Sequence, residues 1–260
     1  MATRGSAAPA SAPASDPMSA PTPAPTTVSF GPWAAGYLSY APPGQAFTAT
    51  EAEFVVPTAT PTVAGTPPGA AVNAWVSLWT GIGLSPGPGQ QLMQAGVSLR
   101  DHGGAWDLVA PWWINEPSAP TRPHSLPLTL HPGDLVRVDV ALTDAQTHTW
   151  RFTVTDVTRE KTATGQCTGC LGVQNSAGWM MEDPSSGSAY TPFADPGPMT
   201  FLSAKAALDG GPLEPLAATV AHPVIRRVAG QVGQGPSGSG PNAQGGFVLT
   251  ALTPDPASSS

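Results

Sequence analysis

Charged side chains are scarce in this sequence, and most of those it has are acidic. Asp, Glu, Lys and Arg make up 10% of its 260 residues, against roughly 25% in ordinary globular domains. Ten residues are Lys or Arg, and the formal net charge is −7. A protein that binds nucleic acid needs a basic face to neutralise phosphates, so we expect no nucleic-acid partner.

Long helical segments and long apolar segments are also missing. No stretch rich in Ala, Glu, Lys and Leu occurs, which excludes helical bundles and coiled coils and disfavours a doubly wound α/β fold. No run of about 18 apolar residues occurs, so we expect no membrane association. Residues 1–27 lack the apolar core of a signal peptide.

Cysteine and histidine are too few and too scattered for a familiar metal site. Cys167 and Cys170 form one C-T-G-C motif, and the five histidines are dispersed along the chain. A structural zinc site needs four ligands, so we expect no metal and no cofactor. The motif predicts either a local disulfide or two free thiols in a turn.

Glycine, proline and short alternating segments are abundant instead. The 29 glycines and 32 prolines separate runs in which apolar residues recur at every second position, which predicts β-strands with one buried face. In 134–142 we expect Val136, Val138 and Val140 to be buried. Further strands are predicted at 52–57, 72–83, 91–99, 105–114, 148–156, 199–208 and 247–252. This spacing indicates an all-β sandwich or jelly roll.

The strand pattern predicts one domain between two tails. We expect residues 28–252 to form the folded domain. Residues 1–27, rich in Ala and Pro, and residues 253–260 are expected to be disordered because they cannot bury enough apolar surface. Inside the domain, the Gly- and Ser-rich stretch 230–246 is predicted to be a long loop before the last strand.

Familiar catalytic motifs are absent. The sequence contains no G-x-S-x-G, no H-E-x-x-H, no P-loop and no D-T-G or D-S-G. A glycosidase needs two facing carboxylates. We find no obvious partner for Glu182, because the adjacent Asp183 would point to the other face of a strand. A glycosidase is therefore the weakest of three hypotheses, and the two stronger ones depend on the segments described next.

An ordered set of segments resembles the glutamic peptidases, or eqolisins. LMQAGVSL (92–99), which contains Gln94, resembles the family's LQTGV-type strand, and GWMMEDP (178–184), which contains Glu182, resembles its EWIVED segment. The other segments that agree in order and spacing are WAAGY (33–37), FVVP (54–57), WTGIG (79–83), PWWINEP (111–117), HPGDLVRVDV (131–140) and FADPGPMTF (193–201). The resemblance covers about residues 30–252.

The resemblance implies a concanavalin-like sandwich of two antiparallel seven-stranded sheets and a secreted, monomeric acid endopeptidase that cleaves proteins or peptides. Glu182 would activate water as a general base and then protonate the leaving amine, while Gln94 would stabilise the oxyanion. Trp79 and Trp112 would line the substrate groove. The 1–27 tail would be the remnant of a pro-segment.

The sequence departs from the family at three positions. Gly83, Ile114 and Gly178 stand where the family has acidic residues, and Glu116 could replace the second only after a shift of register. The alternative is therefore a non-catalytic module of the same fold that binds glycans or proteins. The Gln/Glu pair distinguishes the two hypotheses, because a peptidase needs both residues and a binding module needs neither.

Overall fold

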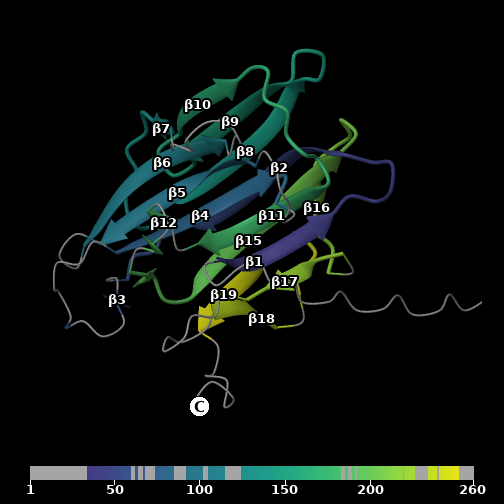
Figure 1. Cartoon of the computed structure of the whole chain (residues 1–260). Helices are drawn as coiled ribbons and strands as arrows, with labels where there is room; N and C mark the ends of the chain where they lie inside the picture. The colour runs from purple at the N-terminus through teal and green to yellow at the C-terminus, as the bar shows by residue number, and fades with distance from the viewer. Residues whose placement is uncertain are drawn as a thin grey trace, which may run out of the picture.

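A computed structural model of the chain describes residues 34–59, 62–63, 67, 74–84, 92–101, 105–114, 124–182, 185–186, 189–190, 192–218, 220–225, 234–238 and 240–251. Throughout these ranges the regular elements are β-strands (Figure 1). Across the same ranges, no helix has the length and hydropathy needed to cross a membrane. The predicted tails, Glu116 and Asp183 lie outside the described residues.

The first sheet supplies the candidate active site. Its strands are β1 (Ala34–Tyr40), β4 (Trp75–Ile82), β5 (Met93–Asp101), β6 (Trp106–Ile114), β7 (His124–Leu126), β11 (Ser176–Glu182) and β17 (His222–Val224). They are antiparallel and follow the order β17-β1-β11-β4-β5-β6-β7. The three strands β11, β4 and β5 therefore lie side by side at the centre of the sheet (Figure 1).

The second sheet has one strand more than the expected seven. Its strands are β2 (Phe47–Val55), β8 (Leu135–Asp144), β9 (Thr149–Asp156), β10 (Lys161–Cys167), β15 (Met199–Leu208), β16 (Glu214–Pro215), β18 (Gln234–Ser237) and β19 (Phe247–Ala251). The main order is β10-β9-β8-β2-β15-β19-β18, and the short β16 pairs with β15 as an eighth strand. Two small sheets join β3 (Thr62–Val63) to β14 (Ala194–Asp195) and β12 (Ser185–Ser186) to β13 (Ala189–Tyr190).

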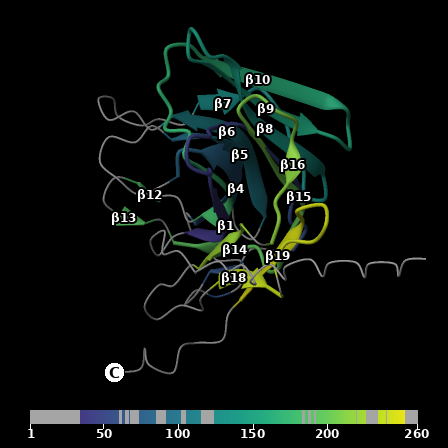
Figure 2. The ribbon, with the colours of Figure 1, turned by 90° about the vertical axis from the view of Figure 1, so that its right-hand side faces the viewer.

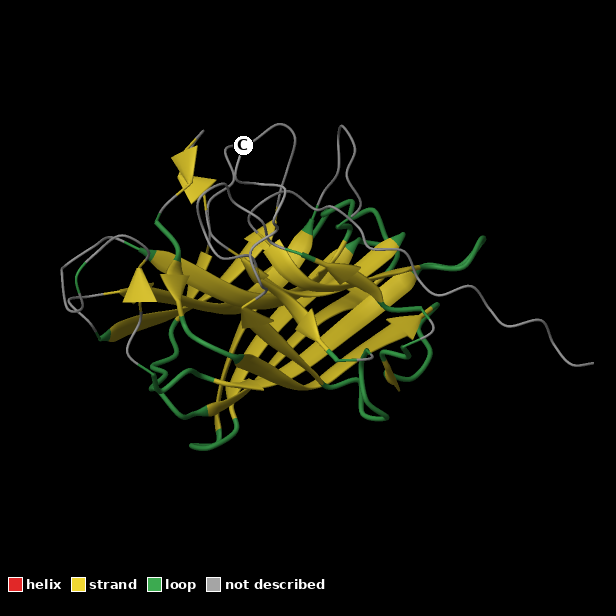
Figure 3. Cartoon of the chain, turned by 90° about the horizontal axis from the view of Figure 1, so that it is seen from below, coloured by secondary structure: helices red, strands yellow, loops and turns green. Residues whose placement is uncertain are grey.

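The two large sheets face each other and enclose the main core (Figure 2; Figure 3). Successive side chains of a strand point to opposite faces, so every second residue enters this core. Val136, Val138 and Val140 are fully buried there, as the alternation predicts, and so are Trp150 and Trp179. The expected all-β sandwich of two antiparallel sheets is thus confirmed.

Two local predictions have different outcomes. Cys167 and Cys170 form a disulfide, which decides between the disulfide and the free thiols. The prediction that 230–246 is one long loop is wrong, because Gln234–Ser237 is the edge strand β18 and pairs with β19. An edge strand that is held by backbone hydrogen bonds needs no apolar alternation and tolerates Pro236.

Candidate active site

Three adjacent strands bring three of the four predicted site residues to one face of the first sheet. Glu182 of β11 pairs with Ser77 of β4, and Gln94 of β5 pairs with Gly81 of β4. Trp79 lies between these two rows of β4. Because side chains alternate along each strand, Glu182, Trp79 and Gln94 share a face. It is the face opposite to the one that carries the core residues of these strands.

Glu182 is held by Trp79. The indole Nε1–H of Trp79 donates a hydrogen bond of 2.5 Å to Oε2 of Glu182. An indole N–H can only donate, so the bond requires a carboxylate oxygen as acceptor and fixes the orientation of the carboxyl group. Trp79 is itself almost completely buried, whereas Glu182 is partly exposed.

Gln94 presents an acceptor on the same face. Its side chain is 7% exposed, and its Oε1 is buried without a hydrogen-bond partner among the described residues. Buried polar atoms of native proteins are normally hydrogen-bonded, and an unmet one costs about 1–3 kcal/mol. Within the described residues, Oε1 of Gln94 is therefore a buried acceptor whose hydrogen bond is unmet.

Glycines opposite Gln94 and Trp79 allow these side chains to lie close to the sheet. Gly81 faces Gln94 across the β4–β5 pair, and Gly96 faces Trp79. A Cβ atom on Gly81 would lie 2.8 Å from Cβ of Gln94, and one on Gly96 would lie 2.6 Å from Cβ of Trp79. Both contacts are too short for real side chains, so glycine is required at each position.

A second, small apolar cluster surrounds Trp79 on the site face. Its buried members are Leu38, Trp79, Leu84, Met180 and Val224, and Leu92 packs against them. Leu84 occupies the space above Gly178, where a Cβ would collide with its Cδ1. The apolar side chain of Leu84 thus fills the space at Gly178, the position where the family has an acidic residue.

Gly83 and Ile114 complete the three departures noted in the sequence. Gly83 has a φ of 86°, a conformation that favours glycine, and its N–H donates to the carbonyl of Ser176. An acid at this position would strain the end of β4. Ile114 is the last residue of β6 and pairs with Met93.

Trp112 does not join the other three residues. It pairs with Ala95 and therefore lies on the core face of the sheet. Its ring stacks on His124 at 4.1 Å and on Phe152 of the opposite sheet at 4.6 Å. The expectation that Trp112 lines a groove with Trp79 does not fit this placement. The residue that pairs with Gln94 is Trp113.

Acidic residues also meet on the outer face of the second sheet, away from Gln94 and Glu182. Asp139 of β8 pairs with Glu51 of β2, and Nζ of Lys205 donates a hydrogen bond of 2.6 Å to Glu51. Burial, with a smaller contribution from the charge of Glu51, raises the pKa of Asp139 from 3.8 to about 6. Across the described part of the chain, no group of three or more His, Cys, Asp or Glu is arranged to hold a metal ion.

Comparisons with known proteins agree with this architecture. Scytalido-glutamic peptidase, solved with a peptide-based transition-state analogue, superposes with a TM-score of 0.58 and 17% identity, covering 85% of this chain and 98% of its own. SCP-B, a member of the eqolisin family solved with the tripeptide Ala-Ile-His, gives a TM-score of 0.57 and 17% identity with the same coverage. At this identity the likeness shows the fold. No curated protein matches in a sequence comparison.

The fold and the site face define a β-sandwich of the eqolisin type. The sequence model of the peptidase A4 family matches residues 32–234, which is most of the chain. This chain therefore belongs to the peptidase A4 family, the glutamic peptidases. The resemblance noted in the sequence is confirmed.

Proposed function

We propose that this glutamic peptidase is an acid endopeptidase that works through Gln94 and Glu182. The observation that carries the proposal is the common face on which β5 and β11 present the two side chains, with Trp79 between their rows and bonded to Glu182. A carboxylate that is fixed by a donor and, on the same face, an amide whose buried Oε1 has no partner among the described residues are the two groups that peptide hydrolysis requires.

Each residue has a distinct task in the reaction. Glu182 accepts a proton from a water molecule as the water oxygen attacks the carbonyl carbon of the scissile bond. Gln94 donates an amide N–H to the oxyanion of the tetrahedral intermediate, and its Oε1 orients the water. When the C–N bond breaks, Glu182 returns the proton to the leaving amine. One carboxyl group suffices because it changes role between the two steps.

The proposed peptidase activity at acid pH is supported by the chemistry of the same two side chains. The amide of Gln94 has no ionisable proton in this range, so its role persists in acid. A glutamate base must be ionised to accept a proton, and an ordinary glutamate has a pKa of about 4.3. The chain also has only ten Lys and Arg, which limits repulsion between positive charges once its carboxylates are neutral.

The proposed substrates are proteins and peptides. The two solved relatives hold a peptide-based transition-state analogue and a tripeptide, and the proposal extends this class of ligand to the face that carries Gln94 and Glu182. Secretion also remains a proposal, supported by the Cys167–Cys170 disulfide, because disulfides persist mainly in oxidising compartments. We further propose that the enzyme is a monomer.

One observation favours the non-catalytic alternative. The space at Gly178 is filled by Leu84, so no acidic side chain supports the dyad from this position. Loss of such support can reduce catalysis by large factors. A protein-binding or glycan-binding module of the same fold would keep Trp79 and its cluster without any need for Gln94.

The deciding experiment is digestion of a denatured protein between pH 2 and pH 7 by the parent and by Glu182→Gln. We expect an acid optimum for the parent and a loss of about a thousandfold or more in Glu182→Gln, with substrate binding retained. Glu214→Gln, at an exposed residue of the second sheet, is the matched control. Equal digestion by the parent and Glu182→Gln would reject Glu182 as the base. If the parent is inert but binds a polysaccharide, the alternative function is correct.

A further inference from the structure

A disulfide lies in the segment that connects β10 of the second sheet to β11 of the first sheet, the strand that ends at Glu182. Cys167 is the last residue of β10, at the edge of the second sheet, and Cys170 is almost fully buried. Their Cα atoms are 6.0 Å apart. Six residues after Cys170 the chain enters β11 in the first sheet. The turn and its continuation, residues 167–172, are called the disulfide turn below.

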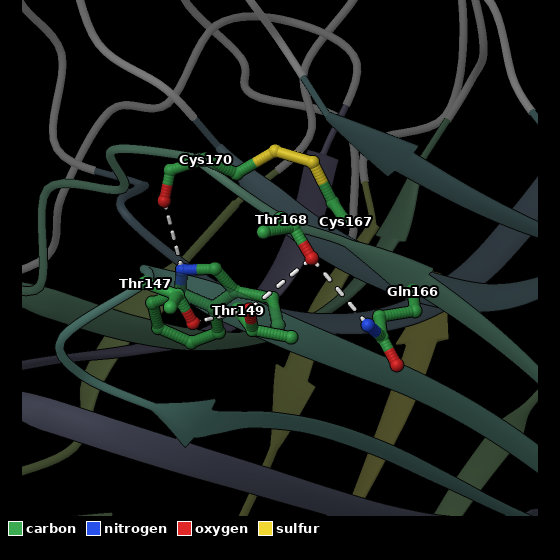
Figure 4. Close-up of a disulfide and its surroundings, with 7 residues drawn as sticks. Thr147, Thr149, Gln166, Cys167, Thr168 and Cys170 are labelled. Atoms are coloured by element: carbon green, nitrogen blue, oxygen red, sulfur yellow. Dashed lines mark hydrogen bonds between the residues drawn. A yellow bond between two sulfur atoms is a disulfide. The ribbon is translucent and has the colours of Figure 1, made fainter.

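Hydrogen bonds fix the disulfide turn on the hairpin between β8 and β9. Backbone N–H groups of Gly169 and Cys170 donate to the carbonyls of Thr147 (3.0 Å) and His148 (3.1 Å). The indole of Trp150 donates to the carbonyl of Cys170 at 3.0 Å, in the core. The hydroxyl of Thr168 receives further bonds from Thr149 and Gln166 (Figure 4).

The disulfide turn touches the strand that carries Gln94. A Cβ on Gly172 would lie 3.2 Å from Cγ and Cε of Met93 and 3.4 Å from Cζ2 of Trp150. Met93 and Trp150 therefore pack directly on the backbone of Gly172. Met93 is fully buried and immediately precedes Gln94 in β5. Because Met93 points into the core and Gln94 to the site, a displacement of Met93 moves the backbone that carries Gln94.

We propose that the disulfide turn positions Gln94 for catalysis through the contact of Gly172 with Met93. Glu182 is less dependent on the turn, because it lies at the opposite end of β11 from Ser176 and is held by Trp79. The turn therefore supports oxyanion stabilisation and leaves proton acceptance unaffected. Gly172 and the two cysteines are positioning residues in this proposal, which rests on the proposed peptidase function.

The kinetic test perturbs the turn in two ways. Cys167→Ser combined with Cys170→Ser removes the cross-link, and Gly172→Ala presses on Met93 while the disulfide stays intact. For each we expect kcat to fall about tenfold at temperatures well below melting, with KM and the acid limb of the pH profile unchanged. Leu171→Ala is the control within the turn, because this side chain is 58% exposed, and it should keep the parent kcat.

The same variants in a Gln94→Ala background separate positioning from general damage. If the turn acts through Gln94, neither variant lowers kcat further once the amide is gone, and a change of less than twofold is expected. An equal fall in both backgrounds would overturn the proposal, since damage that does not involve Gln94 would persist without it.

A spectroscopic readout keeps this proposal distinct from the proposed function. The side-chain amide resonances of Gln94, identified by their loss in Gln94→Ala, should shift or broaden in Gly172→Ala and in the double serine variant and stay unchanged in Leu171→Ala. An inactive parent with these shifts would reject the peptidase and retain the coupling. Unchanged Gln94 resonances in all turn variants would reject the coupling, even in an active peptidase.

Discussion

Trp79 and Glu182 lie on neighbouring strands of the first sheet and are joined by a hydrogen bond of 2.5 Å from the indole Nε1 to the carboxylate Oε2. The indole is almost fully buried within the small cluster on the site face. The indole does not titrate, and packing on several sides fixes it, so it restrains the carboxylate in the same way at every working pH. Trp79 thus connects the apolar packing of the site to its chemistry.

Replacing Trp79 by Phe tests this connection. Trp79→Phe keeps most of the aromatic packing and removes the donor. Hydrogen bonds to charged groups contribute about 1.5–3 kcal/mol, so we expect peptide turnover to fall about ten- to a hundredfold. The measurement is kcat/KM on one peptide at the pH optimum. Trp106→Phe removes a comparable bond from an indole to the carbonyl of Ala59 and should leave turnover unchanged. Equal rates for Trp79→Phe and the parent would show that Glu182 needs no such restraint.

Gly178 and Leu84 give a prediction about stability. In Gly178→Ala the new methyl group meets Leu84, which is buried, and overpacking of this kind costs about 1–3 kcal/mol. In a Leu84→Ala background the methyl group has room, and the cost of Gly178→Ala should largely disappear. Urea unfolding of the four variants gives the coupling free energy. If Gly178→Ala costs the same in both backgrounds, the collision with Leu84 is not the cause.

The outer face of the second sheet gives a prediction about pH. The pKa of Asp139 is raised to about 6 in the folded protein, so the folded state binds this proton more tightly than the unfolded state. Stability from this group is complete below about pH 4 and is lost as the pH rises through 6. Asp139→Asn should therefore raise the free energy of unfolding by about 1–3 kcal/mol at pH 7 and change it little at pH 4.

Urea unfolding at pH 4, 5, 6 and 7 measures this slope. Glu160→Gln, at an exposed turn, provides a matched loss of one negative charge and should not reproduce it. If Asp139→Asn destabilises the protein equally at every pH, the carboxyl group contributes through a contact that does not depend on its charge. The contribution of Asp139 alone would favour the folded state more in acid than at neutral pH.

Alternation within single strands was enough to predict the fold class. The valines of β8 and the aromatic residues of β9 identify their buried face without any knowledge of neighbouring strands, and both faces are as expected. β18 gave no such signal, because Gln234–Ser237 is held at a sheet edge by backbone hydrogen bonds and not by a pattern of apolar side chains.

The sequence motifs predicted the residues of the site but not how neighbouring strands arrange them. Trp112 and Trp113 are both tryptophan, so composition cannot show that Trp112 is the one on the core face, and the decision needs the register of β6 against β5. The collision of a methyl group at Gly178 with Leu84 arises between a residue inside β11 and a residue that follows the end of β4. Such relationships depend on pairing between strands that are distant in sequence, which a single sequence does not contain.

Gln94→Glu provides the most direct test of the dyad. The substitution replaces one NH2 group by oxygen and adds a second carboxyl group to the face that carries Glu182. Two carboxyl groups in one site cannot both ionise cheaply, so the pKa of one should rise and the pH profile should shift.

Loss of the amide donor in Gln94→Glu should lower kcat about a hundredfold or more. The melting temperature should change little in acid, where the added carboxyl group is protonated, because Oε1 of Gln94 has no partner among the described residues. Gln94→Ala should lower kcat to a similar extent without shifting the pH profile, since it adds no acid. If both variants digest protein like the parent, Gln94 takes no part in the reaction and the proposed mechanism fails.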